Sequence, residues 1–378
     1  MRKQIPLFSI FALLIGFSAH AINFSRVNVA WQYDVAFDVK MAHRVVKDEA
    51  GMFVFLKVSS DSIDYWTYEF LLQEEYESEA HRTIQSPSLD TLVDVNGQVL
   101  LKLNLNQVKE NLLVVKFSKP EQFYYYDISL RIGSLSYPSI YPINEQRLPI
   151  LESYINRSGH QWVGSDTLLA MQYLEVAPPA DPPMADMKPL APQVKLDSSF
   201  VFSESPDFRE NYFYNVRKDS LATVGVTILR VPPYFPEYRK LNELIESMLY
   251  LTSEQEKKAM LGSKNPKESF DSFWLNTYST KSRARNAIRK YYNKLENSNR
   301  LFTDYKPGWK TDRGMMYIVF GKPDEVYRSA SSEEWYYDNG GAFEFTIISS
   351  FFAPKTYTLR RSRDFEEQWY TQIAAMRR

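Results

Sequence analysis

Residues 308–326 read GWKTDRGMMYIVFGKPDEV, and this stretch decides how the C-terminal half of the chain is organised. Gly308 and Gly314 have no Cβ, so the backbone can turn sharply at both ends of the short segment between them. Trp309 is large and apolar enough to cover such a segment. We therefore predict a structured loop bounded by the two glycines.

The polar residues inside this loop suggest how it is held. Thr311 and Asp312 carry short side chains that bond nearby backbone N–H groups. Arg313 has the fork geometry that clamps a carboxylate through two hydrogen bonds. We expect Asp312 and Arg313 to form a structural pair that holds the loop.

The run that follows, Met315 to Phe320, is apolar at every position. Continuous apolar runs of this length are typical of strands buried on both faces, which predicts a central strand here. Gly321, Pro323 and Asp324 then predict a second turn at its far end. Asp312 and Asp324 would lie at opposite ends of this strand.

The remaining C-terminal sequence predicts a small antiparallel sheet and a closing helix. Residues 333–337 and 342–348 flank Asp338-Asn339-Gly340-Gly341, a turn in which Asn and Gly tolerate positive φ. Residues 365–376 show helical spacing. Upstream, helix-start signals near Pro236, Ser253, Asn265 and Thr280 predict four helices. We therefore expect residues 236–378 to form an α+β domain.

The residues before Pro236 predict β structure. Runs at 53–58, 65–72, 99–105, 112–117 and 123–132 are β-branched or aromatic, at the spacing of an immunoglobulin-like sandwich over residues 22–151. A second β segment is expected over residues 152–235. It contains a Pro-rich stretch at 177–192, interpreted as a semi-rigid linker or, alternatively, a docking segment for a partner.

The first 21 residues predict export. Arg2 and Lys3 precede a short apolar run, and Ala19-His20-Ala21 resembles a signal-peptidase site. A membrane anchor is the alternative, although the run is only about half of the roughly 20 residues that a spanning helix needs. The chain has no cysteine, so it can form neither disulfides nor a lipid-modified N-terminal cysteine. We expect a periplasmic or extracellular protein without a transmembrane segment in its mature part.

The sequence resembles the GWxTD-domain proteins, a family of uncharacterised exported proteins of Bacteroidota-type bacteria. The namesake motif is present as Gly308, Trp309, Thr311 and Asp312, and the Phe320-Gly321-x-Pro323-Asp324 and Trp335-x-Tyr337 blocks also match. The resemblance implies a signal peptide, N-terminal β domains and this C-terminal module. It implies no established activity.

Several kinds of chemistry have no sequence signature here. The chain contains no Gly-x-Ser-x-Gly elbow, no Gly-rich phosphate loop and no His-Glu-x-x-His. His43, His81 and His160 are isolated, so we expect no metal site, no cofactor and no catalytic set. The net charge of −1 is unlike that of nucleic-acid-binding proteins.

These observations favour a non-enzymatic interaction or scaffold module of the cell envelope, with an envelope protein as partner and possible peripheral contact with the outer membrane. The alternative is a hydrolase or transferase that uses Asp312, Asp324 and Arg313. Trp309, Trp335 and Tyr337 are either core residues or the edge of a binding surface for peptide or glycan. The motif residues with structural or binding roles are thus Gly308, Trp309, Thr311, Asp312, Arg313, Gly314, Gly321, Pro323, Asp324, Trp335 and Tyr337.

Charge is distributed unevenly along the chain. Residues 22–200 carry 15 Lys and Arg against 23 Asp and Glu, whereas residues 279–313 carry 10 Lys and Arg against 3 Asp and Glu. A solvated helix face is the usual reason for such a basic run. The alternatives are contact with an anionic membrane surface and docking on the acidic N-terminal half of the same chain.

Overall fold

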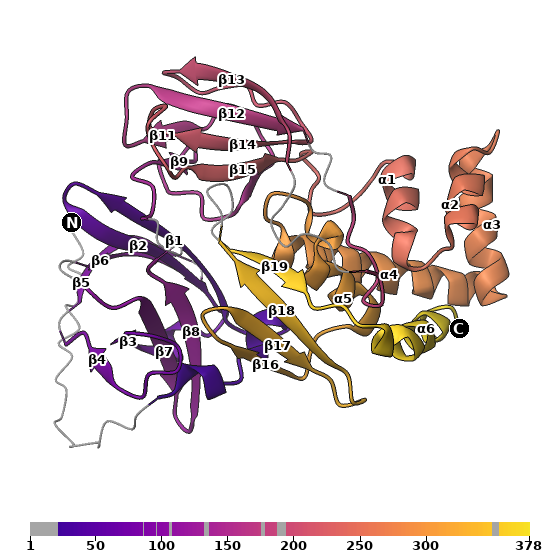
Figure 1. The fold of residues 1–378 in the computed structure, drawn as a ribbon, viewed down its shortest axis with the longest axis horizontal. Coiled ribbons are helices and arrows are strands. Elements are labelled where there is room, and N and C mark those ends of the chain that lie inside the picture. Colours follow the sequence, from indigo (N-terminus) through magenta and orange to yellow (C-terminus); the bar gives the residue numbers. More distant parts are fainter. Residues whose placement is uncertain are drawn as a thin grey trace, which may run out of the picture.

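The computed structural model describes residues 22–85, 87–95, 97–105, 108–131, 136–174, 178–186, 194–349 and 355–378. The expected signal peptide lies outside these residues. Figure 1 shows two β-rich parts, one at the lower left and one at the top, and a mixed part with all the labelled helices at the right.

The N-terminal part contains two four-stranded antiparallel sheets. The first has the order β1-β2-β6-β5 and the second the order β4-β3-β7-β8. Their strands are β1 (Lys40–Asp48), β2 (Gly51–Ser59), β3 (Thr67–Gln73), β4 (His81–Thr83), β5 (Ser88–Val95), β6 (Gln98–Leu105), β7 (Leu112–Lys119) and β8 (Gln122–Ser129). The five strands expected from sequence correspond to β2, β3, β6, β7 and β8.

Strand alternation explains how these two sheets pack on each other. Val54 and Leu56 of β2, together with Leu113 and Val115 of β7, belong to one buried cluster between the sheets. Because successive residues of a strand face opposite sides, the neighbours of Leu113 point away from this cluster. The predicted β-rich N-terminal fold is confirmed, and its immunoglobulin-like layout stays a prediction.

The second β part is a five-stranded sheet of order β10-β15-β14-β12-β13. Its strands are β10 (Tyr154–Ile155), β12 (Leu168–Leu174), β13 (Leu196–Phe202), β14 (Tyr212–Arg217) and β15 (Val226–Arg230), and a separate pair is formed by β9 (Tyr141–Ile143) and β11 (Gln161–Val163). The strands before and after the Pro-rich stretch thus join one sheet, as expected.

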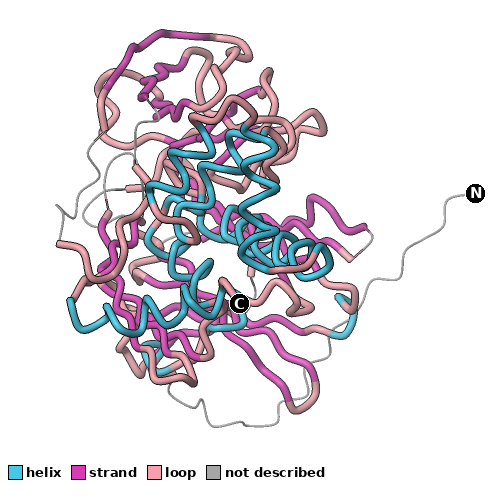
Figure 2. The backbone as a smooth tube through the Cα atoms, turned by 90° about the vertical axis from the view of Figure 1, so that its right-hand side faces the viewer, coloured by secondary structure: helices cyan, strands magenta, loops and turns pink. Residues whose placement is uncertain are grey.

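Helices dominate the next part of the chain and gather on one side of the molecule (Figure 2). They are α1 (Leu241–Glu246), α2 (Glu254–Leu261), α3 (Pro266–Tyr278), α4 (Lys281–Phe302), α5 (Asp312–Phe320) and α6 (Glu366–Met376). The described residues also form short 3-10 helices. Those in the N-terminal part are η1 (Phe24–Arg26), η2 (Ala30–Tyr33) and η3 (Ile63–Tyr65), and those in the C-terminal part are η4 (Ser247–Tyr250), η5 (Gly308–Lys310) and η6 (Arg363–Phe365). The predicted capping box of Ser253 and Glu256 is present, and Asn265 and Thr280 cap α3 and α4 as expected.

The predicted central strand at Met315 to Phe320 is wrong, because these residues form most of α5. Residues 315–319 are all buried, so the segment has no polar face to reveal a helical period. A short apolar run of this kind does not distinguish a buried strand from a buried helix. The cap at Thr311 decides between them.

The small C-terminal sheet has the order β16-β17-β18-β19 and is antiparallel. Its strands are β16 (Glu325–Arg328), β17 (Ser332–Tyr336), β18 (Ala342–Ile348) and β19 (Thr356–Leu359). The hairpin predicted at residues 338–341 joins β17 to β18. β16 and β19 are the edge strands that sequence reasoning did not identify.

The largest core combines residues from both ends of the chain. Phe24 and Tyr33 near the N-terminus, and Leu71 and Val114 of β3 and β7, share a buried cluster with the C-terminal helices and sheet. The sheet β4-β3-β7-β8 is therefore buried on both faces, one against the first sheet and one against the C-terminal part. Asn28 Oδ1 accepts a hydrogen bond from Val326 N at 3.0 Å, which attaches the N-terminal segment to β16.

The described part of the Pro-rich stretch, residues 178–186, packs on the C-terminal part rather than serving as an exposed spacer. Ala180 is buried, and its N–H donates to Lys310 O at 2.9 Å. Ser362 N donates to Pro183 O at 3.0 Å. The segment lies as a strap on the C-terminal part, held by backbone hydrogen bonds to η5 and to the residue before η6.

Candidate functional site

The GWxTD segment is the point where α4, η5 and α5 meet, and its two glycines are there for close packing. A Cβ on Gly308 would lie 2.0 Å from Ser298 O, and a Cβ on Gly314 would lie 1.8 Å from Gly308 O. Neither glycine is among the residues with positive φ. Our expectation of sharp turns at these positions is corrected: they are glycines because α4 leaves no room for a side chain.

Thr311 and Trp309 fix the segment between the glycines. Thr311 Oγ1 accepts from Gly314 N at 3.0 Å and donates to Gly308 O at 2.7 Å, so it caps α5 and closes the turn before it. Trp309 is buried and donates from Nε1 to the Tyr238 hydroxyl at 2.8 Å. The predicted covering role of Trp309 thus takes the form of a core residue.

Asp312 and Arg313 do not pair with each other, so that expectation is wrong. Asp312 accepts from Leu359 N at 2.7 Å and pairs with Arg361 at 2.8 Å, which ties the start of α5 to the end of β19. Arg313 points elsewhere and lies 3.4 Å from Glu333. Adjacent positions on a helix face different directions, and this separates the two side chains.

The second turn of the motif ends α5. Gly321 follows the helix with a φ of 91°, which only glycine adopts easily. Pro323 is buried, and the exposed Asp324 accepts from Asp338 N at 2.8 Å. Asp312 and Asp324 lie at opposite ends of α5, whose nine residues rise about 13 Å. No contact between described residues brings these two carboxylates together.

Trp335 and Tyr337 are core residues. Trp335 is fully buried and donates from Nε1 to Glu333 Oε1 at 2.8 Å. Tyr337 is buried and donates to Gly321 O at 3.1 Å. Because Trp309, Trp335 and Tyr337 are all buried, they do not form the edge of a peptide- or glycan-binding surface. Tyr336, which lies between Trp335 and Tyr337 in the sequence, is exposed.

Next to this core lies a buried network of charges that joins the two ends of the chain. Glu333, fully buried, accepts from the Tyr33 hydroxyl at 2.7 Å and from Arg328 Nε at 2.8 Å. Arg328 also pairs with Asp127 of β8, and Arg313 donates to the Tyr33 hydroxyl at 3.0 Å. The network connects β8, η2, α5 and the small sheet.

The charges in the network shift the pKa values of its two carboxylates. Burial opposes ionisation of Asp127, but Arg328 and Lys355 outweigh it and lower the pKa of Asp127 to about 2. The pKa of Glu333 is also lowered, because Arg328 and Arg313 outweigh its desolvation. Both carboxylates are thus held charged inside the protein by their arginine partners.

Sequence reasoning missed this network, although one signal was available. In the strand Ser332–Tyr336, alternation places Glu333 on the same face as Trp335. A charged residue on an otherwise aromatic face indicates a buried partner. The partners of this glutamate are Arg328 and Arg313 on neighbouring elements and Tyr33, 300 positions away. Arg328 in turn pairs with Asp127 across 201 positions, and no local pattern identifies the two distant members of the network.

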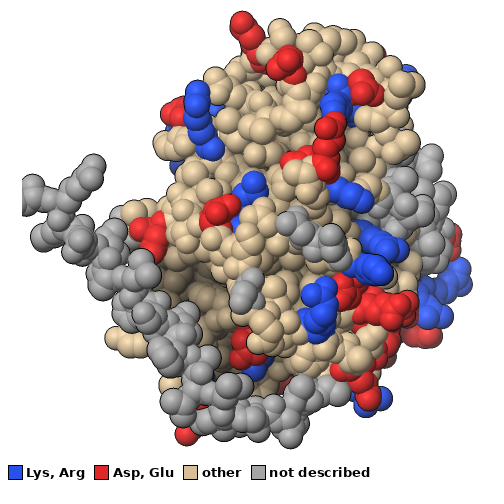
Figure 3. Space-filling model, turned by 90° about the vertical axis from the view of Figure 1, so that its left-hand side faces the viewer, with Lys and Arg blue, Asp and Glu red and all other residues tan. Residues whose placement is uncertain are grey.

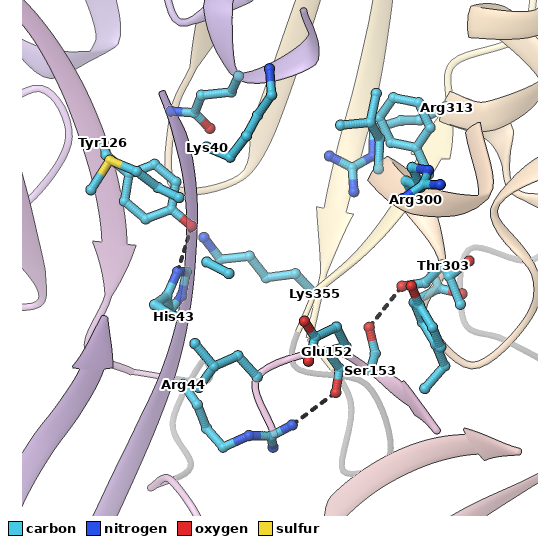
Figure 4. Close-up of a pocket in the computed structure, with 18 of the residues that line it drawn as sticks. Lys40, His43, Arg44, Tyr126, Glu152, Ser153, Arg300, Thr303, Arg313 and Lys355 are labelled. Atoms are coloured by element: carbon cyan, nitrogen blue, oxygen red, sulfur yellow. Dashed lines mark hydrogen bonds between the residues drawn. The ribbon is translucent and has the colours of Figure 1, made fainter. Parts of the chain in front are cut away.

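A cavity of about 1000 Å³ opens beside the network, between the two β parts and the C-terminal part. Its wall includes His43 and Arg44 of β1, Arg300 of α4, Arg313 of α5 and Lys355 just before β19. Figure 4 shows these side chains directed into the space from opposite sides.

The surface offers two further observations. Five basic residues of α4 are exposed, so α4 does not dock on the acidic N-terminal half; they are Lys281, Arg283, Arg285, Arg289 and Lys290. On the face shown in Figure 3, residues of both signs are interspersed.

The described residues carry neither a candidate metal site nor a candidate membrane-spanning helix. No group of three or more His, Asp or Glu side chains there could hold a metal ion. Within the same residues, no helix has the length and apolar character needed to cross a membrane.

Comparison with known families gives one match. The family model described as the GWxTD domain matches residues 212–378, so the match begins in β14, ahead of the boundary expected at Pro236. No curated protein and no solved structure matches the chain. The matched region contains the whole α4–η5–α5 junction and the small sheet. Residues 212–378 therefore carry a GWxTD domain.

Proposed function

We propose that this protein is an exported cell-envelope protein that acts as a non-enzymatic interaction or scaffold module, periplasmic or peripheral to the outer membrane. The observation that carries the proposal is that the polar groups of the GWxTD motif bind the protein's own chain. Thr311, Asp312 and Trp309 each have intramolecular partners at 2.7–2.8 Å. The motif thereby supports a rigid body rather than a reaction.

The carboxylates of the motif are poorly placed for acid–base chemistry. A catalytic carboxylate has to reach the proton that it transfers. The Asp312 side chain is only 11% exposed and is occupied by Arg361 and Leu359 N. Asp324 is exposed, but it lies at the other end of α5 and holds the hairpin turn. These contacts favour the scaffold function over the hydrolase or transferase.

The partner surface that we favour is the basic face of α4. Its five Lys and Arg residues are exposed along one long helix, whereas the opposite face packs into the core through Ala284, Tyr291 and Leu295. Lys281, Arg285 and Arg289 are spaced four residues apart and form an exposed row of cations along the helix, which fits a partner with an acidic surface. Such a contact would depend on ionic strength.

Crosslinking in the native envelope tests this function. We expect the tagged protein to be recovered with one envelope protein in stoichiometric amount. Replacing Lys281, Arg285 and Arg289 with Glu should abolish that recovery. The matched control replaces Lys47, Lys109 and Lys218, three exposed lysines of the β parts, with Glu and should leave it unchanged. Recovery of the protein alone would contradict the proposal.

The export part of the proposal has its own test. The mature protein isolated from the envelope should begin at Ile22, as read by N-terminal sequencing. Replacing Ala19 and Ala21 with bulky residues should leave an unprocessed precursor. A cytoplasmic protein that retains Met1 would contradict export without touching the question of the partner.

A further inference from the structure

The cavity at the meeting point of the three parts has an unusual distribution of charge. His43 and Arg44 reach it from β1, and Lys355 reaches it from the residue before β19. Figure 4 shows Lys355 extending toward His43 and Tyr126, with Arg44 on the same side of the space. Basic groups from two distant parts of the chain thus converge on one wall.

Neither Arg44 nor Lys355 forms an ion pair among the described residues, although Glu152 acts electrostatically on Arg44 and Asp127 interacts with Lys355. Arg44 donates only to backbone carbonyls, to Ile150 O at 2.6 Å and to Glu152 O at 3.0 Å. Lys355 donates to the Tyr76 hydroxyl at 3.3 Å. The described ion pairs include neither of them. No carboxylate of the described residues contacts either cation directly, so an anion that enters the cavity can accept hydrogen bonds from both.

His43 reports the same excess of positive charge. Its Nδ1 lies 2.8 Å from the Tyr126 hydroxyl. Burial, assisted by the positive charges of Lys355 and Arg44, lowers the pKa of His43 to about 4. The imidazole is therefore neutral near pH 7 and can serve as a hydrogen-bonding group beside the two cations.

Four acidic residues line the cavity; Glu152 is exposed and acts electrostatically on Arg44 without an ion pair, and the other three are engaged elsewhere. Asp127 is paired with Arg328 inside the buried network. Asp304, after the end of α4, accepts from Lys306 N at 3.1 Å and lies within the electrostatic reach of Arg313. Asp34 pairs with Lys322 at 2.9 Å. None of the three forms an ion pair with Arg44 or Lys355.

We propose that this cavity binds a small molecule through an oxyanion group, a carboxylate or a phosphate, held between Lys355 and Arg44 beside His43. A volume of about 1000 Å³ is at the upper end of what small-ligand sites enclose, so the anion can be part of a larger polar molecule. Tyr126, Tyr137 and Tyr357 line the same space and supply ring faces for the body of such a ligand. The inference is independent of the partner proposed for α4.

Calorimetric titration of residues 22–378 tests the site with four probes: inorganic phosphate, glucose 6-phosphate, glucuronate and glucose. We expect at least one of the three anions to bind with a millimolar or lower dissociation constant, and glucose not to bind. Binding of glucose 6-phosphate and phosphate identifies a phosphate ligand, whereas binding of glucuronate alone identifies a carboxylate. Added salt should weaken the binding of whichever anion is recognised.

Variants locate the binding. Lys355→Gln and Arg44→Gln should each weaken it by tenfold or more, whereas Lys109→Gln, which removes an exposed lysine between β6 and β7, should not change it. Because Arg44 also joins β1 to residues 150–152, the Lys355 variant is decisive if Arg44→Gln unfolds. Absence of binding for all three anions, or binding that Lys355→Gln leaves intact, would overturn the proposal. Either result would leave the crosslinking test of α4 unaffected.

Discussion

Asp127 of β8 and Arg328 of β16 form a buried ion pair across 201 positions of sequence, with 1% and 7% of their side chains exposed. The pair joins the second N-terminal sheet to the GWxTD domain. Tyr76 donates to the same carboxylate at 2.8 Å, so Asp127 receives bonds from both sides of the boundary. We infer that the N-terminal sandwich and the GWxTD domain fold as one body.

Asp127→Asn should destabilise the protein by about 3–5 kcal/mol, because Arg328 would lose one of its two buried carboxylate partners and keep only Glu333. Denaturant unfolding followed by tryptophan fluorescence measures the change. The control is Glu69→Gln, which breaks the exposed pair with Lys116 and should cost less than about 1 kcal/mol. Equal effects of the two substitutions would contradict the structural role of the network.

Gly314→Ala should destabilise the GWxTD domain by about 3 kcal/mol or more, since the new Cβ would meet Gly308 O at 1.8 Å, a backbone atom that cannot move aside. Thermal unfolding measures this effect. Gly262→Ala serves as control, because its nearest contact would be 3.2 Å, and it should change stability by less than about 1 kcal/mol. A stable Gly314→Ala protein would show that η5 and α5 are not in the close contact described.

Asp312→Asn should cost about 1–3 kcal/mol through loss of its charged pairing with Arg361. Arg361→Gln should cost a similar amount, and the double substitution should cost clearly less than the sum, because both remove the same interaction. Additive effects in this cycle would mean that the pair does not form. If neither single substitution changed the melting temperature, the structural function of the motif would be contradicted.

Stability should fall steeply below about pH 4. The pKa of Asp127 is lowered from 3.8 to about 2, so the stabilisation from its ionised form is complete above pH 4 and is lost as the pH falls toward 2. Glu333, whose pKa is also lowered, acts in the same direction. Unfolding free energies measured from pH 7 to pH 2 test this, and Asp127→Asn should flatten the acid limb.

Between pH 6.5 and pH 4 two groups oppose each other. Burial lowers the pKa of His43 to about 4, which favours the folded state at higher pH, whereas burial raises the pKa of Asp304 to about 6, which favours it at lower pH. Asp304→Asn should therefore stabilise the protein at pH 7 and have little effect near pH 3.5. A variant that is destabilised at pH 7 would contradict the unfavourable burial of this carboxylate.

Local sequence patterns predicted those elements whose signals lie within a few residues of each other. Ser253 with Glu256, Asn265 before Pro266, and the Asn339-Gly340 turn each specify a cap or a hairpin by chemistry that needs no distant partner. The strands with alternating polarity were likewise predictable. These features determined the α+β character of the C-terminal half and the β-rich character of the N-terminal half.

Only the tertiary structure decided how the motif works. Residues 315–319 are apolar in any conformation, and it is the Thr311 cap packed on α4 that makes them helical. From the sequence alone, a glycine at 308 or 314 can indicate either a turn or a close contact. The role of these two positions depends on Ser298 of α4, which packs against both. Asp312 and Arg313 found their partners, Arg361 and Glu333, on other elements. The sequence determined which groups would be charged, apolar or without a side chain. The tertiary structure determined which of these groups contact one another, because the free energy of burying a group depends on neighbours that are distant in sequence.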